Sequence, residues 1–320
     1  MRSKHPSRVL LVGENSDPEL QAVRKRLEAR GVRWTLLSYD SDLSLRIDGV
    51  CAAWRLGEVL WRVSPSGPAD PAPFVSAFVR SNGMRIEAPA GRRPGGMSGA
   101  VLERERFYRA ENAALRSSFL EALESAGCRM YNSIRFFMVE KPLLLFKMAS
   151  VGVPVPDSLF TRSPDEFRGF ARKFPQAILK PVTEGYARRL KAEDLRNAGR
   201  VSRAPVTLNR FVEGRDARLY VCDGEVVSGS WSEPLKKGDL GNSPQREFEL
   251  APSPKMKKAA IRAASVCGLR FSGVDLRIGE DGEFVILECN SMPSFIHVES
   301  QVGTPISDHV ASALAKAPAK

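Results

Sequence analysis

The 320-residue sequence lacks any apolar run that approaches the length of a membrane span. Its basic start, Met1 to Lys4, is not followed by the apolar stretch of a secretion signal, so we expect a cytoplasmic protein without a membrane partner. Cysteine is scarce, and the five cysteines are odd in number, scattered and without metal-ligand spacing. The sequence therefore excludes a disulfide scaffold and a zinc motif, and it predicts reduced, mostly buried thiols.

Acidic residues are fewer than basic ones, because 37 aspartates and glutamates oppose 48 lysines and arginines, for a formal net charge of +11. Such an excess favours an anionic partner, which includes nucleotides, nucleic acids and acidic peptides. The densest basic segment, residues 188–203, has only Tyr186 as a nearby aromatic. Platforms for single-stranded nucleic acids interleave aromatic and basic residues, so nucleic acid is the disfavoured partner. A solvated basic face and a site for an acidic partner both stay open.

The N-terminal residues predict a small open α/β domain. A buried strand at 8–13, a helix capped by Ser16 or Asp17 with Pro18 in its first turn, and a strand at 32–38 form a βαβ pattern. The residues after the first strand do not form a phosphate-binding glycine motif, so we do not expect a nucleotide in this domain. The Pro/Gly-rich tract 64–99 is interpreted as a short helix with loops.

Hydrophobic periodicity predicts the remaining elements. A long helix at 103–126 ends at Gly127, and its predicted apolar side consists of Phe107, Ala110, Ala114, Leu115, Phe119, Leu120 and Leu123. Further helices are expected at 141–151, from Ser163, at 256–266 and at 306–314. Strands are expected at 177–182, 206–212, 217–222 and 225–230, the last two joined by an Asp223-Gly224 turn.

The most informative stretch is a predicted hairpin from Gly273 to Asn290. Its Asp281-Gly282 pair favours a two-residue type I′ turn, which places Ile278 opposite Val285 and Asp275 opposite Glu288. A period of two then separates an apolar face from a polar face. The apolar face holds Val274, Leu276, Ile278, Val285, Leu287 and Cys289, and the polar face holds Asp275, Arg277, Glu288 and Asn290.

Two carboxylates that face each other across a strand pair have Cβ atoms about 5 Å apart, and they repel unless positive charge lies between them. Magnesium prefers oxygen ligands of this kind, and the amide oxygen of Asn290 could add a third beside Asp275 and Glu288. A surface hairpin whose acids face water is the alternative. On the repulsion argument, neutralising either acid is expected to maintain or raise the stability of the metal-free protein.

At residues 130–310 the order of the motifs resembles the ATP-grasp ligases. The motifs are Lys141 at a helix start, Ile178-Leu179-Lys180-Pro181, Asn209 to Arg218, Gly273-Val274-Asp275-Leu276, and Leu287 to Pro293. The resemblance implies an α/β fold of α+β lobes, with an N-terminal open α/β domain at 1–130. A central ATP-grasp lobe with a lid would follow at 131–205, and a C-terminal lobe with the metal site at 206–320.

The resemblance also implies roles for individual residues. Lys141 and Lys180 would hold the ATP phosphates, and Arg218 would face the γ-phosphate or the acyl phosphate, so Arg218 and Lys180 are the expected catalytic residues. Further nucleotide contacts would come from Asn209, Arg210, Phe211, Val212 and Asp216, and the magnesium ions, two in number, would be held by Asp275, Glu288 and Asn290. The sequence departs from the family at Arg210, which replaces a common acidic residue, and in a shortened lid at 183–187.

The N-terminal half resembles the microviridin-type ligases, the graspetide synthetases, and the chain is also similar to the glutamate ligases of ribosomal proteins. The stretches that carry the first resemblance are 53–65, 103–115, 140–156 and 299–306. It implies ATP-dependent ester or amide formation in a ribosomal precursor peptide, with an acidic peptide or amino acid as substrate. A ligase for small amino acids or protein termini and a non-catalytic basic binding protein are the alternatives, and a homodimer is left open.

Overall fold

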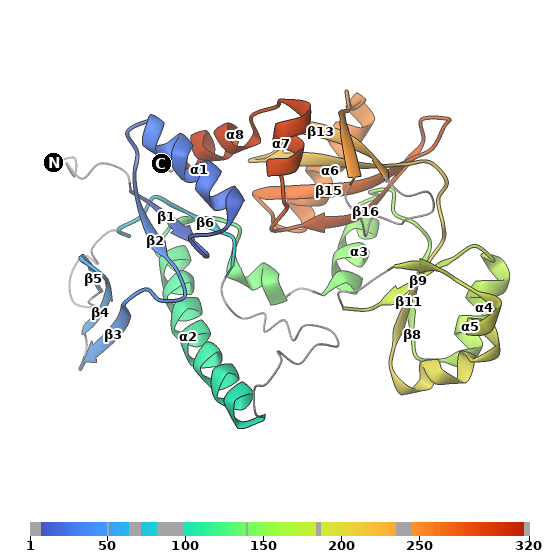
Figure 1. Cartoon of the computed structure of the whole chain (residues 1–320), viewed down its shortest axis with the longest axis horizontal. Coiled ribbons are helices and arrows are strands. Elements are labelled where there is room, and N and C mark those ends of the chain that lie inside the picture. The colour runs from blue at the N-terminus through green and yellow to red at the C-terminus, as the bar shows by residue number, and fades with distance from the viewer. Residues whose placement is uncertain are drawn as a thin grey trace. The chain divides into compact units, whose positions relative to one another are not determined.

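The computed structural model describes residues 8–49, 51–63, 72–81, 99–138, 140–183, 187–234 and 245–316. The chain divides into two compact units, Met1–Phe137 with Ser307–Lys320, and Met138–Ile306 (Figure 1). The C-terminal residues from 307 thus group with the N-terminal unit, whereas the sequence assigned them to the last lobe. No helix in the described ranges is long and apolar enough to cross a membrane.

The first unit is built on a parallel sheet in the order β2-β1-β6-β7. Asp17 caps the first helix as predicted, since its side chain accepts a hydrogen bond from the Leu20 amide at 2.7 Å and Pro18 occupies the first turn. The last helix joins this unit through the Leu314 carbonyl, which accepts from the Ser76 hydroxyl at 2.7 Å. The elements are β1 Arg8–Val12, α1 Pro18–Ala29, β2 Arg33–Leu37, β6 Ser76–Val79, α2 Gly99–Ser125, β7 Arg129–Tyr131 and α8 Ile306–Ala315.

Two expectations for this unit were wrong. Within the tract interpreted as a short helix with loops, residues 76–79 form β6, a fully buried strand that pairs with both β1 and β7; most of the remaining tract lies outside the described residues. In α2 the predicted apolar side is buried only at its C-terminal end, at Phe119, Leu120 and Leu123. Phe107 is 60 % exposed. The N-terminal turns of α2 extend past the core, which ends near Ala113.

A separate three-stranded sheet is also part of the first unit. It is antiparallel, in the order β3 Leu43–Asp48, β4 Cys51–Leu56 and β5 Val59–Val63. Trp54 and Trp61 pair across β4 and β5 and are buried in the same core as Phe119. This sheet therefore extends the core of the first unit.

The second unit begins with a small antiparallel sheet in the order β10-β9-β11-β8. Its core consists of Phe167, Ala177, Ala198, Val201 and Leu208. Ser163 caps α4 as predicted, through a hydrogen bond from the Glu166 amide. The elements are β8 Ser158–Thr161, α4 Pro164–Lys173, β9 Ile178–Pro181, β10 Arg188–Arg189, α5 Ala192–Arg196, the 3-10 helix Ala198–Arg203 and β11 Val206–Asn209.

A five-stranded sheet, in the order β14-β13-β12-β15-β16, forms the rest of the second unit. Helix α6 packs on one face of this sheet and buries Ala260, Ala263 and Ala264. The predicted Asp223-Gly224 turn between β12 and β13 is confirmed, since Cys222 pairs with Glu225. Both turn residues have the positive φ of a type I′ turn, 47° and 80°. The elements are α3 Lys141–Ser150, β12 Arg215–Cys222, β13 Glu225–Pro234, β14 Gln245–Glu249, α6 Pro254–Val266, β15 Phe271–Ile278, β16 Phe284–Asn290 and α7 Ile296–Val302.

In the central hairpin, β15 and β16, Asp275 pairs with Glu288 as predicted, but the turn and the register beside the turn differ from the prediction. The turn is longer than two residues, since the Gly279 amide donates to the Glu283 carbonyl, and Ile278 lies opposite Phe284 instead of Val285. A register shift next to Leu276 then restores the predicted alignment. The β-bulge leaves one extra residue in β16, Leu287, between the partners of Asp275 and Leu276.

The bulge also changes the faces of the hairpin. Residues Phe284, Ile286 and Cys289 of β16 join Val274 and Leu276 in the core. Val285 and Leu287, which were expected on the apolar face, are only partly buried. The bulge adds one residue to β16. The side chains between the turn and the bulge therefore point to the face opposite to the predicted one, whereas those beyond the bulge keep the predicted face.

Candidate active site

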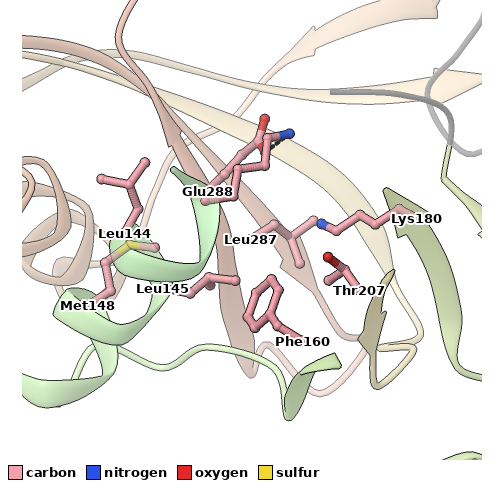
Figure 2. Close-up of a pocket in the computed structure, with 9 residues that line it drawn as sticks. Leu144, Leu145, Met148, Phe160, Lys180, Thr207, Leu287 and Glu288 are labelled. Atoms are coloured by element: carbon pink, nitrogen blue, oxygen red, sulfur yellow. Dashed lines mark ion pairs between the residues drawn. The ribbon is translucent and has the colours of Figure 1, made fainter. Parts of the chain in front are cut away.

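A pocket in the second unit brings together three of the predicted site residues (Figure 2). Lys141 comes from the start of α3, Lys180 from β9 and Glu288 from β16. In Figure 2 the Lys180 side chain reaches from its strand toward Leu287, below Glu288. These residues are up to 147 positions apart in sequence, and the two sheets of the unit place them on one cavity.

The apolar wall of this pocket was not predicted. It is formed by Leu144, Leu145, Met148, Phe160 and Leu287, with Thr207 as a further polar member. The sequence does hold a signal for part of it, since three of these residues follow Lys141 at positions i+3, i+4 and i+7 and therefore share its face of α3. Leu287 could not be found in this way, because only the bulge turns it toward the pocket. Apolar walls with charged groups at one end suit a flat ring that carries phosphates.

The two lysines and Glu288 form one electrostatic group. Lys141 Nζ lies 3.1 Å from Glu288 Oε2. Burial lowers the pKa of Lys180, Glu288 counteracts this effect, and Lys141 adds to it. Burial alone would raise the pKa of Glu288, but Lys141, Lys180 and Arg218 outweigh it, so that the pKa of this carboxyl lies below its usual value. The pocket thus has two cations against one carboxylate, and the surplus positive charge favours an anionic ligand.

Arg218 and Asp275 form the second charged group of the site. Arg218 donates to both carboxylate oxygens of Asp275, with Nε to Oδ1 at 2.5 Å and Nη2 to Oδ2 at 2.9 Å. The side chains are 29 % and 20 % exposed. Asp275 raises the pKa of Arg218, against the effect of burial. Burial raises the pKa of Asp275, while Arg218 opposes that shift.

The register of the large sheet places these groups in one row. Glu249, Ser230, Arg218, Asp275 and Glu288 lie directly opposite one another on successive strands, from β14 to β16. Residues that face each other across strands point to the same side of a sheet. We call this side, away from α6, the polar face. The repulsion predicted between the two carboxylates is countered by a separate basic partner on each, Arg218 on one and Lys141 on the other.

The predicted contacts for the nucleotide base lie elsewhere in the unit. Asn209 Nδ2 donates to Ser158 Oγ at 2.6 Å, and the Arg210 side chain pairs with Asp157 at 3.0 Å. The Phe211 ring lies below two guanidinium groups, that of Arg189 at 3.8 Å and that of Arg277 at 5.2 Å from the ring centre. Asp216 accepts from Arg277 at 2.9 Å, and Val212 is half-buried. None of these five predicted residues lines the pocket, so their nucleotide contacts stay a prediction.

The predicted metal ligands are two carboxylates and one side-chain amide. Asp275 and Glu288 are opposite each other, as predicted, and the Asn290 Oδ1 atom accepts from the Met292 amide at 2.9 Å. An amide oxygen with one hydrogen bond keeps a second lone pair. No group of three or more histidine, cysteine or acidic side chains in the described ranges is arranged to hold a metal ion, so a metal here would need the amide oxygen or ligand oxygens besides the two carboxylates. That donor set fits magnesium, which usually takes one or two carboxylates together with phosphate oxygens.

The remaining predictions near the site have mixed outcomes. Cys128, Cys222, Cys267 and Cys289 are buried and Cys51 is exposed, which agrees with the prediction that most of the thiols are buried. The middle of the shortened lid, residues 184–186, lies outside the described residues. The same holds for residues 235–244, between β13 and β14.

The second unit thus holds two lysines and Glu288 on one pocket, with the Arg218–Asp275 pair beside it, on two sheets. The family model of the RimK-like ATP-grasp domain matches residues 207–314. Residues 207–314 thus match a RimK-like ATP-grasp domain, and the architecture is mixed α/β, as the sequence predicted.

Two curated relatives support this assignment. Human N-acetylaspartylglutamate synthase A is 25 % identical over 222 residues, which cover 61 % of this chain and 55 % of the relative. The tetrahydromethanopterin:alpha-L-glutamate ligase of Methanocaldococcus jannaschii is 29 % identical over 179 residues, or 49 % of this chain and 59 % of the ligase. The chain spans less than two thirds of the length of these relatives.

Among solved structures, the ATP-grasp ligase PsnB in complex with a minimal precursor is similar over nearly the whole chain. The TM-score is 0.78 at 28 % identity, and the match covers 97 % of this chain and 98 % of PsnB. The same ligase has been solved with its minimal precursor, Mg and ADP. The similarity to PsnB extends into the N-terminal part of the first unit, which lies outside the residues that the family model matches.

Proposed function

We propose that this protein is an ATP-dependent ligase that joins a carboxylate to an amine or a hydroxyl through an acyl phosphate. The observation that carries the proposal is the convergence of Lys141, Lys180 and Glu288 on one pocket, next to the Arg218–Asp275 pair. PsnB, solved with Mg and ADP, and the ligases and synthases among the relatives support it.

In the proposed mechanism the apolar wall from α3 holds the adenine ring, and the two lysines lie along the phosphates. Lysine suits this role because its flexible ammonium acts as a point charge on phosphate oxygens. The partial desolvation of Lys180 strengthens its attraction to a phosphate, since fewer waters compete for the charge. Asp275, Glu288 and Asn290 would hold magnesium, which when bound supplies further positive charge at the phosphate oxygens. We propose two ions, as the resemblance implies.

Arg218 binds the charge that develops on the reacting groups. Its guanidinium is fixed by Asp275 and directed along the polar face, beside the strand that carries Glu288. The donor carboxylate attacks the γ-phosphate, the bond from the γ-phosphorus to the β–γ bridging oxygen breaks, and ADP leaves. The planar guanidinium stabilises the negative charge on the acyl phosphate oxygens. The acceptor then bonds to the acyl carbon as inorganic phosphate leaves. The protein contributes mainly by positioning and by neutralising charge.

Hydroxylamine provides a direct test, because it traps an acyl phosphate as a hydroxamate whatever the natural acceptor is. The purified protein would be incubated with ATP, magnesium chloride, hydroxylamine and a panel of carboxylates that includes L-glutamate, N-acetyl-L-aspartate and glutamate-rich peptides. We expect hydroxamate and ADP to form together with at least one of these donors. The Arg218→Met variant should form neither. ADP release without hydroxamate would contradict the acyl phosphate.

For the substrate class we propose an acidic peptide, as in a ribosomal precursor. PsnB, which is similar over the full length, binds a minimal precursor. The basic segment of this chain also leaves Arg196, Arg200 and Arg203 exposed, and none of them forms an ion pair in the part of the chain that the structure describes. Three unpaired guanidinium groups favour a ligand with several carboxylates.

The competing substrate is a small amino acid, which the name of N-acetylaspartylglutamate synthase A suggests for a ligase of this kind. Reversing the charges of Arg196, Arg200 and Arg203 to glutamate should weaken the binding of an acidic peptide while hydroxamate formation from free glutamate is unchanged. Single-stranded DNA serves as the competitor, because added salt would weaken both peptide binding and DNA binding and therefore cannot distinguish the two. Equal displacement of the peptide by DNA at physiological salt would contradict peptide specificity. Sedimentation would test for a homodimer.

A further inference from the structure

Beyond Arg218, the polar face carries a carboxylate–imidazole pair that the proposed mechanism does not use. His297 Nε2 lies 3.6 Å from Glu247 Oε1. The histidine comes from α7 and the glutamate from the edge strand β14, 50 residues earlier. The Glu247 side chain is 9 % exposed, whereas that of His297 is 47 % exposed. The carboxylate is thus shielded from water while the imidazole is accessible to a ligand.

The fold holds α7 over the polar face with three contacts. The Tyr220 hydroxyl donates to the Ser294 carbonyl at 2.8 Å, just before the helix. Phe295 is fully buried and packs edge-on against Phe271, with ring centres 5.8 Å apart. At the other end of α7, Gln301 Oε1 accepts from the Glu247 amide at 3.0 Å. The position of His297 is therefore fixed on both sides.

The same contacts place the pair on the face of the sheet that carries Arg218. The Tyr220 hydroxyl interacts with Arg218 and lies within electrostatic range of Glu247, and burial raises the pKa of this tyrosine. In the sheet register, Glu247 lies opposite Ser232, which in turn lies opposite Asp216, two residues from Arg218 on β12. Arg218 therefore has Glu288 and the lysines on one side and Glu247 with His297 on the other.

The surface between these groups has hydrogen-bonding capacity that is not used. Ser230 is directly opposite Arg218, is 1 % exposed, and its hydroxyl has no hydrogen-bond partner among the described residues. Ser228, two residues earlier and 7 % exposed, is in the same state. Buried hydroxyls without partners are costly, and they mark places where a ligand group or an ordered water completes the network.

We propose that His297 is the catalytic base that takes the proton from the acceptor, and that Glu247 is the residue that positions it; this inference rests on the proposed ligase function. The Nε2 atom faces Glu247, so the other ring nitrogen, Nδ1, is available to the acceptor. The acceptor O–H or N–H bond breaks as its oxygen or nitrogen bonds to the acyl carbon. The bond from that carbon to the phosphate oxygen breaks, inorganic phosphate leaves, and the proton moves to His297. The carboxylate of Glu247 stabilises the imidazolium that forms.

The test compares two acceptors in one variant. Hydroxylamine attacks an acyl phosphate without a catalytic base, whereas a peptide hydroxyl or lysine amine must lose its proton. In His297→Ala we expect hydroxamate formation within twofold of the wild type, and joining to peptides that carry threonine, serine and lysine slowed by about 100-fold, the usual contribution of a general base. Free imidazole should restore part of the lost rate, and His297→Gln should be as slow as the alanine variant.

Each outcome has a separate meaning. The matched control is His309→Ala, since His309 is an exposed histidine on α8, in the other unit; it should be as active as the wild type. If His297→Ala joins peptides at the wild-type rate, or loses hydroxamate and peptide products together without imidazole rescue, His297 is not the base. A wild type that forms hydroxamate but joins no hydroxyl or amine also overturns the inference. A wild type that forms no hydroxamate refutes the ligase proposal itself.

Discussion

Substitution of Asp275 by asparagine removes the repulsion between Asp275 and Glu288, and it also removes the ion pair between Asp275 and Arg218. The sequence predicted that neutralising this acid relieves repulsion with Glu288 and maintains or raises the stability of the metal-free protein. The ion pairs give the opposite expectation, because Asp275 receives two hydrogen bonds from Arg218 at 2.5 and 2.9 Å. In Asp275→Asn the guanidinium loses its counter-charge and keeps at most one acceptor.

The magnitude follows from the burial of the pair. Removing one partner of a fully buried ion pair costs about 3–5 kcal/mol. These side chains are 29 % and 20 % exposed, and asparagine retains one hydrogen bond, so we expect Asp275→Asn to lower the free energy of unfolding by about 2–3 kcal/mol. For a unit of about 170 residues this corresponds to a fall in Tm of roughly 5–10 °C. Glu288→Gln breaks a pair whose side chains are about one third exposed, and we expect a loss of about 1 kcal/mol or less.

Thermal melts in chelator would measure both values. Glu283→Gln is the matched control, because it also removes an acid from this hairpin. The ion-pair partner of Glu283 is Lys255, which is 66 % exposed, so the substitution should leave Tm nearly unchanged. The double variant Arg218→Met, Asp275→Asn should recover most of the stability, since it leaves no unpaired charge. A melting temperature of Asp275→Asn equal to or above that of the wild type would refute the reasoning and return the hairpin to the repulsion model. All variants at Asp275 should lose hydroxamate formation.

Three further predictions follow from the site and its scaffold. Lys180→Ala should weaken ATP binding by at least tenfold in calorimetry, while Tm stays within a few degrees of the wild-type value. The reason is that the lysine reaches into the pocket and contributes a charge, not core packing. Unchanged ATP affinity would make Lys180 a surface cation. ATP should bind much more weakly in EDTA than with magnesium, and equal affinities would contradict the carboxylate site. Gly214→Ala should lower the free energy of unfolding by several kcal/mol, since its φ is +133° and an added Cβ would lie 2.0 Å from the Ile278 carbonyl oxygen. Gly282→Ala, where the added atom meets nothing, should cost only about 1 kcal/mol, and comparable melting temperatures for the two variants would contradict this.

The pairing of Asp275 with Glu288 illustrates what pattern alone can predict and where it stops. Alternation and a turn signal gave the correct partners, although the predicted turn was one residue too tight. The bulge at Leu287 corrected the register before the carboxylates were reached. Whether a hairpin takes a two-residue turn or a longer turn with a bulge depends on packing against α6 and α3, which local sequence does not contain.

The sequence by itself determined the order and chemical type of the motifs. It also determined the helix starts and one turn, because caps and turns depend on residues only a few positions apart. Asp17 and Ser163 cap helices as predicted, and the Asp223-Gly224 turn has the expected conformation. Lys141 and Lys180 were singled out by their motifs, and the structure brings both to one pocket.

Only the tertiary structure decided which charges neutralise one another and what surrounds them. The pairs Arg218–Asp275 and Arg277–Asp216 are formed between strands of the large sheet, and the apolar wall of the pocket combines α3, β8 and β16. Glu247 and His297 are 50 residues apart, and neither lies in a motif that signals the other. Ion pairs and pockets of this kind depend on side chains meeting across elements that are distant in the chain, and those distances are fixed by the packing of the sheets and helices.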